Sequence, residues 1–204
     1  MSMFCYQCQE TAKNTGCTVR GVCGKTEEVA KLQDLIVYTL KGIADIAVKG
    51  NLKAEDLKEV NRQVLNALFM TITNANFDDT ALEQKIFELI SIRDELAKKT
   101  GLKELHDAAR FYVKDRAEML DKAAAVGVLA TKDEDIRSLK QMITYGLKGM
   151  AAYCEHALNL GMEDFSISDF IYSALSAILD DNISADDLVS LTLKTGEYGV
   201  KAMA

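Results

Sequence analysis

The sequence contains no proline and no tryptophan among its 204 residues. At the average usage of about 5%, a chain of this length would carry roughly ten prolines. Proline interrupts helix interiors, because it has no backbone amide and its ring clashes with the preceding turn. Its absence therefore favours a chain that is nearly all helix, and the absence of tryptophan argues against an aromatic cage or stacking platform.

Long apolar runs and an excess of positive charge are also missing. No window approaches the roughly 18 uninterrupted apolar residues of a membrane span, and the N-terminus lacks the basic and apolar regions of a signal peptide. We therefore expect a cytoplasmic protein with no membrane contact. The net charge of −7 argues against nucleic acid as a partner.

Helical periodicity dominates the sequence after residue 25. Apolar residues recur at spacings of three and four, and Thr26, Gly101 and Ser184 are typical of helix boundaries. Thr131 and Glu134 form the pattern of a capping box at the start of another helix. No segment alternates with the period of a strand, so we predict an all-α fold without a sheet.

The two halves of the helical region are related to each other. Seven residues of the first half recur in the second at one constant interval, and the Tyr-x-Leu-Lys-Gly match is too dense for periodicity alone. We infer two related three-helix bundles: a cysteine-rich loop at 1–25, a first bundle at 26–101, a helical connector at 102–130 and a second bundle at 131–204. The equivalent pairs are Leu32 and Leu139, Ile36 and Ile143, Tyr38 and Tyr145, Leu40 and Leu147, Lys41 and Lys148, Gly42 and Gly149, and Ala44 and Ala151.

One repeated pair consists of glycines inside helices. Gly42 and Gly149 each cost about 1 kcal/mol relative to alanine at such a position. A cost at two equivalent positions indicates a shared structural reason. We expect a close helix–helix approach at both.

Four of the five cysteines lie near the N-terminus, at Cys5, Cys8, Cys17 and Cys23, with the spacing C-x2-C-x8-C-x5-C. A disulfide framework is disfavoured, because the chain has ample apolar helices and no secretory signal. A structural zinc site usually takes two C-x2-C pairs, and only the first pair has that spacing. A cubane accepts longer arms between its ligands, so the spacing favours a [4Fe–4S] cluster over zinc or disulfides.

Residues around these cysteines suit a cluster. Gly16 and Gly21 lie beside the ligands, where we expect their free amides to donate to cluster sulfurs. Lys25 is one of three basic residues in this loop that would offset the negative charge of the cluster. Phe4 and Tyr6 flank the first ligand and would shield the site from water.

Three further residues of reactive type are interpreted as structural. Cys154 lies on the apolar stripe of a helix, where a lone cysteine behaves as a small hydrophobe. His106 and His156 lie at helical positions with no paired acid or nucleophile evident from the spacing. We therefore assign no catalytic residue to this chain.

The cysteine loop resembles the N-terminus of the hybrid cluster proteins, which are also called prismane proteins or hydroxylamine reductases. The resemblance covers the whole chain. It is carried by residues 4–13 and 16–25, and continues through residues 32–35, 40–44, 72–79 and 147–153.

The resemblance implies two three-helix bundles and a [4Fe–4S] cluster on Cys5, Cys8, Cys17 and Cys23, since members with longer intervals carry a [2Fe–2S] cluster instead. It also implies reduction of hydroxylamine and nitric oxide under nitrosative stress. In this family the hybrid Fe–S–O cluster takes its histidine, glutamate and cysteine ligands from two further α/β domains. Cys154 is the only cysteine left here for such a role, so we expect a truncated form, an excised domain or one part of a split protein.

The sequence thus predicts an electron-transfer region. A redox donor protein, a reductase or a ferredoxin-like protein, would supply the electron. The acceptor would be a hybrid cluster on the missing C-terminal α/β domains or on a partner chain that carries them. The alternative is a non-enzymatic helical scaffold or interaction domain, whose cysteines hold a structural zinc or remain empty.

Overall fold

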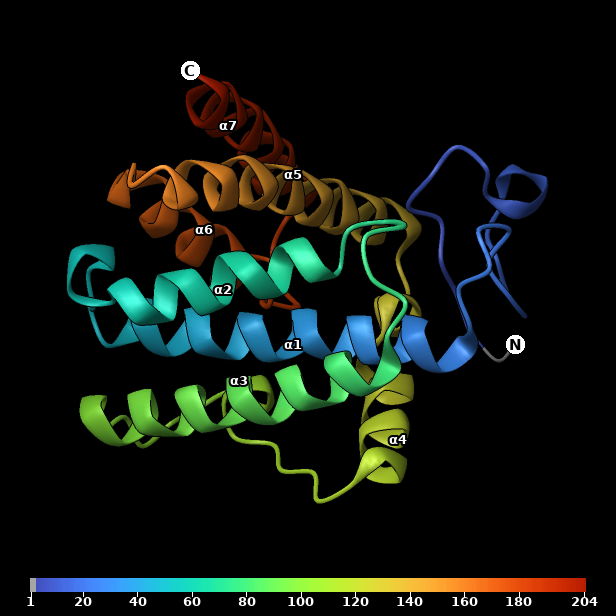
Figure 1. Ribbon diagram of the computed structural model, residues 1–204, viewed down its shortest axis with the longest axis horizontal. Helices are drawn as coiled ribbons and strands as arrows, with labels where there is room; N and C mark the ends of the chain where they lie inside the picture. The colour runs from blue at the N-terminus through green and yellow to red at the C-terminus, as the bar shows by residue number, and fades with distance from the viewer. Residues whose placement is uncertain (1–2) are drawn as a thin grey trace.

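The structure is a computed structural model that describes residues 3–204. Within that range the chain forms seven α-helices and no β-strand, which confirms the predicted all-α class (Figure 1). None of these helices has the length and apolarity that a bilayer crossing requires. The helices are α1 (Glu27–Lys49), α2 (Lys58–Met70), α3 (Asp79–Thr100), α4 (Arg116–Val126), α5 (Glu134–Asn159), α6 (Phe165–Ala177) and α7 (Ala185–Met203), with 3-10 turns η1 (Ala12–Asn14), η2 (Ala54–Asp56), η3 (Asp107–Ala109) and η4 (Val128–Ala130).

Three helix boundaries lie where the sequence predicts them. The Thr26 hydroxyl accepts a hydrogen bond from the Val29 amide at 3.3 Å and begins α1. The Ser184 hydroxyl accepts one from the Asp187 amide at 3.1 Å and begins α7. Gly101 ends α3 in the left-handed conformation, with φ of 65°, which glycine adopts without steric cost.

The start of α5 differs from the predicted capping box. The helix begins at Glu134, and the Asp133 carboxylate accepts from the Ile136 amide at 2.9 Å. Thr131 instead follows η4 in an extended conformation. Aspartate is as good an N-cap as threonine or better, so the cap lies two residues later than the box pattern indicates.

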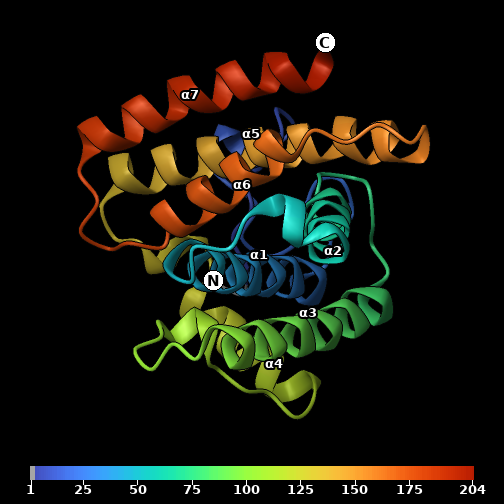
Figure 2. The same ribbon diagram turned by 90° about the vertical axis from the view of Figure 1, so that its left-hand side faces the viewer.

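In the structure, the two duplicated halves exchange helices with each other. The long helix of each half packs on the third helix of the same half, so α1 lies on α3 and α5 lies on α7. The second helices are exchanged: α6 packs on α1, and α2 packs on α5 (Figures 1 and 2). The three-helix groups are therefore α1–α3–α6 and α5–α7–α2. Figure 2 shows α6 and α2 in the layer between the two long pairs.

The exchange gives the helices one continuous hydrophobic core. Polar contacts also cross between the halves. The Ala54 amide donates to the Asp169 carboxylate at 2.9 Å, and the Tyr172 hydroxyl donates to the Asn61 side-chain oxygen at 2.8 Å. The predicted division into a first bundle at 26–101, a connector at 102–130 and a second bundle at 131–204 stays a prediction.

The connector after α3 explains one of the two repeated glycines. The buried Arg93 guanidinium donates to the carbonyls of Ala108 at 3.3 Å and Phe111 at 2.7 Å, which holds the connector in place. A Cβ atom on Gly42 would lie 2.1 Å from the Ala108 carbonyl oxygen, whereas one on Gly149 would meet nothing within 4 Å. The expected shared reason is therefore wrong, because α1 approaches the connector and not a helix, and α5 has no such neighbour.

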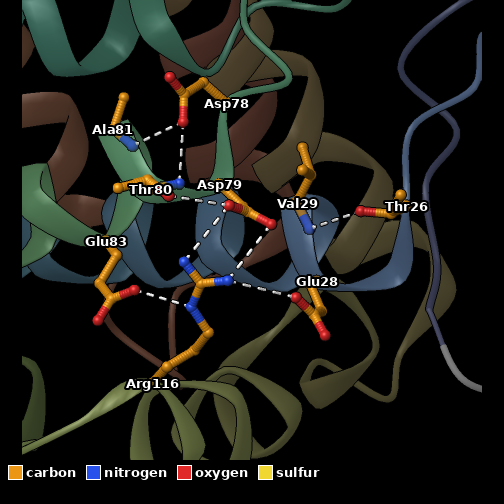
Figure 3. A network of polar contacts seen from close by, with 9 residues as sticks. All are labelled: Thr26, Glu28, Val29, Asp78, Asp79, Thr80, Ala81, Glu83 and Arg116. Carbon is orange, nitrogen blue, oxygen red and sulfur yellow. Dashed lines mark hydrogen bonds and ion pairs between the residues drawn. The ribbon is translucent and has the colours of Figure 1, made fainter.

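An ion-pair network fastens α4 to the first half. Arg116 Nε donates to Glu83 at 2.7 Å, and Arg116 Nη1 lies 3.3 Å from Asp79 and 3.6 Å from Glu28 (Figure 3). A single pair at this exposure contributes little, but several partners around one guanidinium fix its geometry. Residues from α1, α3 and α4 thereby meet at one point.

Candidate metal centre

The cysteine loop lies at one end of the molecule, beside the N-terminal ends of α1 and α5 (Figure 1). Cys5 and Cys17 are joined by an antiparallel bridge: the Cys5 amide donates to the Cys17 carbonyl at 3.1 Å, and the Cys17 amide donates to the Cys5 carbonyl at 2.8 Å. Residues that exchange both hydrogen bonds lie directly opposite each other, with Cα atoms about 5.5 Å apart. Two of the four predicted ligands are therefore brought together by backbone geometry.

The other two cysteines lie in turns. The Cys8 carbonyl accepts from the Thr11 amide at 3.2 Å and from the Thr11 hydroxyl at 2.6 Å. Cys23 lies in a turn closed by the Gly21 amide, which donates to the Lys25 carbonyl at 2.8 Å. A Cβ atom on Gly21 would lie 3.0 Å from Cys23 Sγ, so glycine leaves room for this thiol.

The four thiols differ in exposure and do not yet form a complete ligand set. Cys17 is buried, Cys5 and Cys8 are half-buried, and Cys23 is exposed. In residues 3–204, no three histidine, cysteine or acidic side chains are arranged to hold a metal ion. Four thiols on one short loop nevertheless match a cubane in the number and softness of its ligands. The donor set thus fits an iron–sulfur cluster, and the structure pairs two of its members.

A positive charge near the loop opposes the effect of burial on the pKa of the Cys5 thiol. Burial raises the pKa of the Cys5 thiol, while the ammonium of Lys25 acts to lower it. Lys25 is itself only 1% exposed, and its Nζ donates to the Gln33 side-chain oxygen at 2.6 Å. Because the thiolate is the form that binds metal, this buried cation favours the ligand state of Cys5.

Aromatic rings pack against one another in the loop and between the loop and α5. A Cβ atom on Gly16 would lie 2.5 Å from the Phe4 ring, so only glycine fits beneath it. The Phe4 and Tyr6 ring centroids are 5.2 Å apart, and Tyr6 meets Tyr145 of α5 edge-on at 6.3 Å. The expectation of free glycine amides is wrong, since the Gly16 amide donates to the Ala12 carbonyl at 3.3 Å and the Gly21 amide also has a backbone partner.

The histidines and the fifth cysteine have neighbours of other kinds. His106 Nδ1 accepts from the Ala108 amide at 3.0 Å and caps η3. The His156 ring lies 6.1 Å from the Phe69 ring. Cys154 is half-buried against the hydrophobic core, and burial raises the pKa of its thiol.

Sequence reasoning missed the residues that fasten the loop to the helices. The buried Lys148 Nζ donates to the Thr71 carbonyl at 3.1 Å and to the Gln7 side-chain oxygen at 3.3 Å. The Thr73 hydroxyl donates to the same oxygen at 3.3 Å. A signal was present, because Lys148 belongs to the repeated Tyr-x-Leu-Lys-Gly motif and interrupts an otherwise apolar stripe.

Known proteins match this chain over almost its whole length. Residues 3–204 match the Prismane/CO dehydrogenase family. The chain is 64% identical over 204 residues to a protein named hydroxylamine reductase from Acetivibrio thermocellus, 49% identical over 211 residues to one from Clostridium perfringens, and 50% identical over 210 residues to one from Desulfitobacterium hafniense. All of this chain is covered in each case, but it spans only 38% of the length of these relatives.

Proposed function

The chain belongs to the Prismane/CO dehydrogenase family, and we propose that it forms the iron–sulfur electron-transfer region of a hydroxylamine reductase. One observation carries this proposal. Cys5 and Cys17 face each other across a two-hydrogen-bond bridge in a four-cysteine loop. That loop belongs to a chain that matches proteins named hydroxylamine reductase over its full length.

Cys5, Cys8, Cys17 and Cys23 are the residues that would hold a [4Fe–4S] cluster. When bound, such a cluster accepts and releases a single electron. The chain supplies the surroundings: Phe4 and Tyr6, whose rings are in contact, would limit the access of water, and Lys25 places a buried positive charge near Cys5. Both features act on reduction potential in iron–sulfur proteins.

The partners follow from electron transfer. A reductase or a ferredoxin-like protein in the cytoplasm would donate the electron. The acceptor would be a hybrid cluster held by α/β domains of a longer protein or by a partner chain. Reduction of hydroxylamine or nitric oxide, in defence against nitrosative stress, would take place there and not on the 204 residues of this chain.

A second candidate is a helical scaffold whose cysteines hold zinc or remain empty. It is favoured by the separation of the two apolar clusters. The main core consists of residues beyond the loop, while the loop contributes to a small cluster of Met3, Cys17 and Ala30. The helices therefore have a core that does not depend on a bound cluster.

Anaerobic reconstitution with iron and sulfide tests the proposal. We expect about four irons per chain and a broad visible absorption that dithionite bleaches. Cys8→Ser should lose most of this iron, whereas the matched control Cys154→Ser should keep it, because Cys154 lies in α5 outside the loop. Uptake of one zinc with no iron, or equal iron loss in both variants, would contradict the cluster and support the scaffold.

A further inference from the structure

A polar cavity of about 220 Å³ lies between α1, α5 and the segment that joins α4 to α5. Three lysines line it: Lys41 from α1, and Lys140 and Lys148 from α5. The cluster function proposed above does not use this cavity.

Two of the lysines are buried against neutral acceptors. Lys140 and Lys148 are each 5% exposed. Lys140 Nζ donates to the Asp180 carbonyl at 2.7 Å, and Lys148 Nζ donates to the Thr71 carbonyl and the Gln7 side chain. Carbonyl oxygens satisfy hydrogen bonds but do not neutralise an ammonium group, whose burial is costly without an opposite charge.

The third lysine has no hydrogen bond or ion pair with any residue of the described chain. Lys41 is half-buried and is one of the residues that line the cavity. Burial and the positive charge of Lys140 lower the pKa of Lys41 to about 8. Burial likewise lowers the pKa of Lys148 to about 8. These lysines are thus still largely protonated at pH 7.

The acidic groups facing the cavity do not balance this charge. Burial raises the pKa of Asp34 to about 6, against the attraction of Lys148, Lys25 and Lys41, so at pH 7 Asp34 is mostly ionised and supplies one negative charge against the three lysines of the cavity. Asp181 lies 3.9 Å from Lys140 Nζ, but its side chain is 89% exposed and screened by solvent.

The internal duplication explains the imbalance. Lys41 and Lys148 are equivalent positions, and both copies line the same cavity. Asp34 is equivalent to Gln141, which also lines it. The duplicated arrangement therefore supplies the lysine twice and the carboxylate once, and Lys140 adds a further positive charge.

We propose that this cavity binds a small oxyanion, a phosphate-like anion or a carboxylate group, between Lys41, Lys140 and Lys148. Charge-assisted hydrogen bonds from ammonium groups are the usual means of holding such anions. A water molecule takes up about 30 Å³ in the liquid, so the cavity has room for an oxyanion with several waters. The source is either a free oxyanion or a carboxylate side chain of the additional polypeptide that the longer relatives contain.

Isothermal titration calorimetry at low ionic strength and pH 7 tests the site, with sodium phosphate and sodium acetate as probes of the 204-residue chain. We expect saturable binding at one site. Lys41→Gln should weaken it by about tenfold or more, because it removes a charge-assisted partner. The fold should persist, since the Lys41 side chain makes no hydrogen bond. Asp34→Asn should tighten binding several-fold.

Lys98→Gln is the matched control, because it removes the same charge from an exposed position on α3. Its affinity should stay within about twofold of the unchanged chain, as expected for a distant surface charge. Preference for phosphate would indicate a free oxyanion, and preference for acetate a carboxylate side chain. Absence of saturable binding for both probes, or equal losses in Lys41→Gln and Lys98→Gln, would overturn the site.

Discussion

Charged side chains that contact the connector show how single residues position whole segments. Asp107, at the start of η3, accepts hydrogen bonds from the Tyr38 hydroxyl of α1 at 2.7 Å and from Lys122 Nζ of α4 at 2.5 Å. Arg93 holds the same segment from α3 through two carbonyls. Four elements therefore meet at residues 107–111, and the connector is fastened by polar contacts as well as apolar ones.

The Asp107 contacts predict a pH dependence of stability. Burial acts to raise the pKa of Asp107, but hydrogen bonds from Lys122 and Tyr38 outweigh it and leave the pKa below the usual 3.8. A lowered pKa in the folded state gives stability that is present above the unfolded value and lost as the pH falls through the folded value. Because the group is partly exposed, we expect Asp107→Asn to cost only about 0.5–1 kcal/mol at pH 7.

Urea unfolding from pH 7 down to pH 3 measures this effect. The difference between Asp107→Asn and the unchanged chain should shrink as the pH falls below the usual aspartate value. Asp121→Asn, at an exposed position of α4, serves as control and should change little at any pH. A difference for Asp107→Asn that stays constant down to pH 3 would show that the carboxylate charge is not what stabilises the contact.

Some features of individual residues were predictable from the sequence and others were not. The spacing of Cys5, Cys8, Cys17 and Cys23 indicated one loop, because neighbouring residues in a short loop are close whatever the fold. The partners of Lys25 and Lys148 were not predictable. Their acceptors come from distant segments, and only the packing of α1, α2 and α5 brings them near.

The periodicity of the sequence predicts where most helices lie along the chain, but it does not predict which helices pack against each other. An apolar stripe identifies which face of a helix is buried. It does not identify the helix that covers that face. The exchange of α2 and α6 between the halves could therefore not be predicted from the sequence, although the duplication itself could. The sequence predicts a helical connector at 102–130, and the structure has the short turn η3 and helix α4 within it.

At the two repeated glycines we predict opposite effects of an alanine substitution on stability. Gly42→Ala would place a methyl group 2.1 Å from the Ala108 carbonyl oxygen, which is backbone and must move. We expect a loss of roughly 2–3 kcal/mol in the free energy of unfolding, as for overpacked interiors. Gly149→Ala would meet nothing within 4 Å, so we expect a gain of up to about 1 kcal/mol from helix propensity.

Chemical denaturation of both variants and of the unchanged chain measures whether each substitution lowers or raises the free energy of unfolding. Circular dichroism at the start of each titration checks that the helices are retained. Similar losses at both positions would mean that the face of α5 at Gly149 is covered in solution. Equal gains would mean that the connector yields at Gly42 despite its bonds to Arg93.

At the scale of the whole molecule, duplication and exchange combine to build one core from two copies of a helical unit. Each long helix is covered by one helix from its own half and one from the other. Neither half can therefore bury its apolar faces fully by itself. The cysteine loop is attached at one end of this core, through Gln7 to Lys148 and Thr73. The helical body therefore contacts the loop through side chains of its own core helices and their connections.

The same arrangement predicts that the 204-residue chain does not reduce hydroxylamine by itself. The family resemblance implies a hybrid cluster with histidine, glutamate and cysteine ligands. Beyond the loop, Cys154 is the only cysteine of this chain, and it is half-buried in α5. The resemblance places these ligands on α/β domains of a longer protein, so we expect electrons accepted by a reconstituted loop not to reach hydroxylamine.

An anaerobic assay with reduced viologen measures hydroxylamine turnover by the reconstituted chain. The hydroxylamine reductase of Acetivibrio thermocellus, which is 64% identical but much longer, serves as the positive control. Free iron and sulfide at matched concentration set the background. We expect reduction of the cluster by viologen, but oxidation by hydroxylamine no faster than this background. Turnover above background that disappears in Cys8→Ser would show that the loop itself reduces hydroxylamine, and the cluster would then be an active site and not a relay.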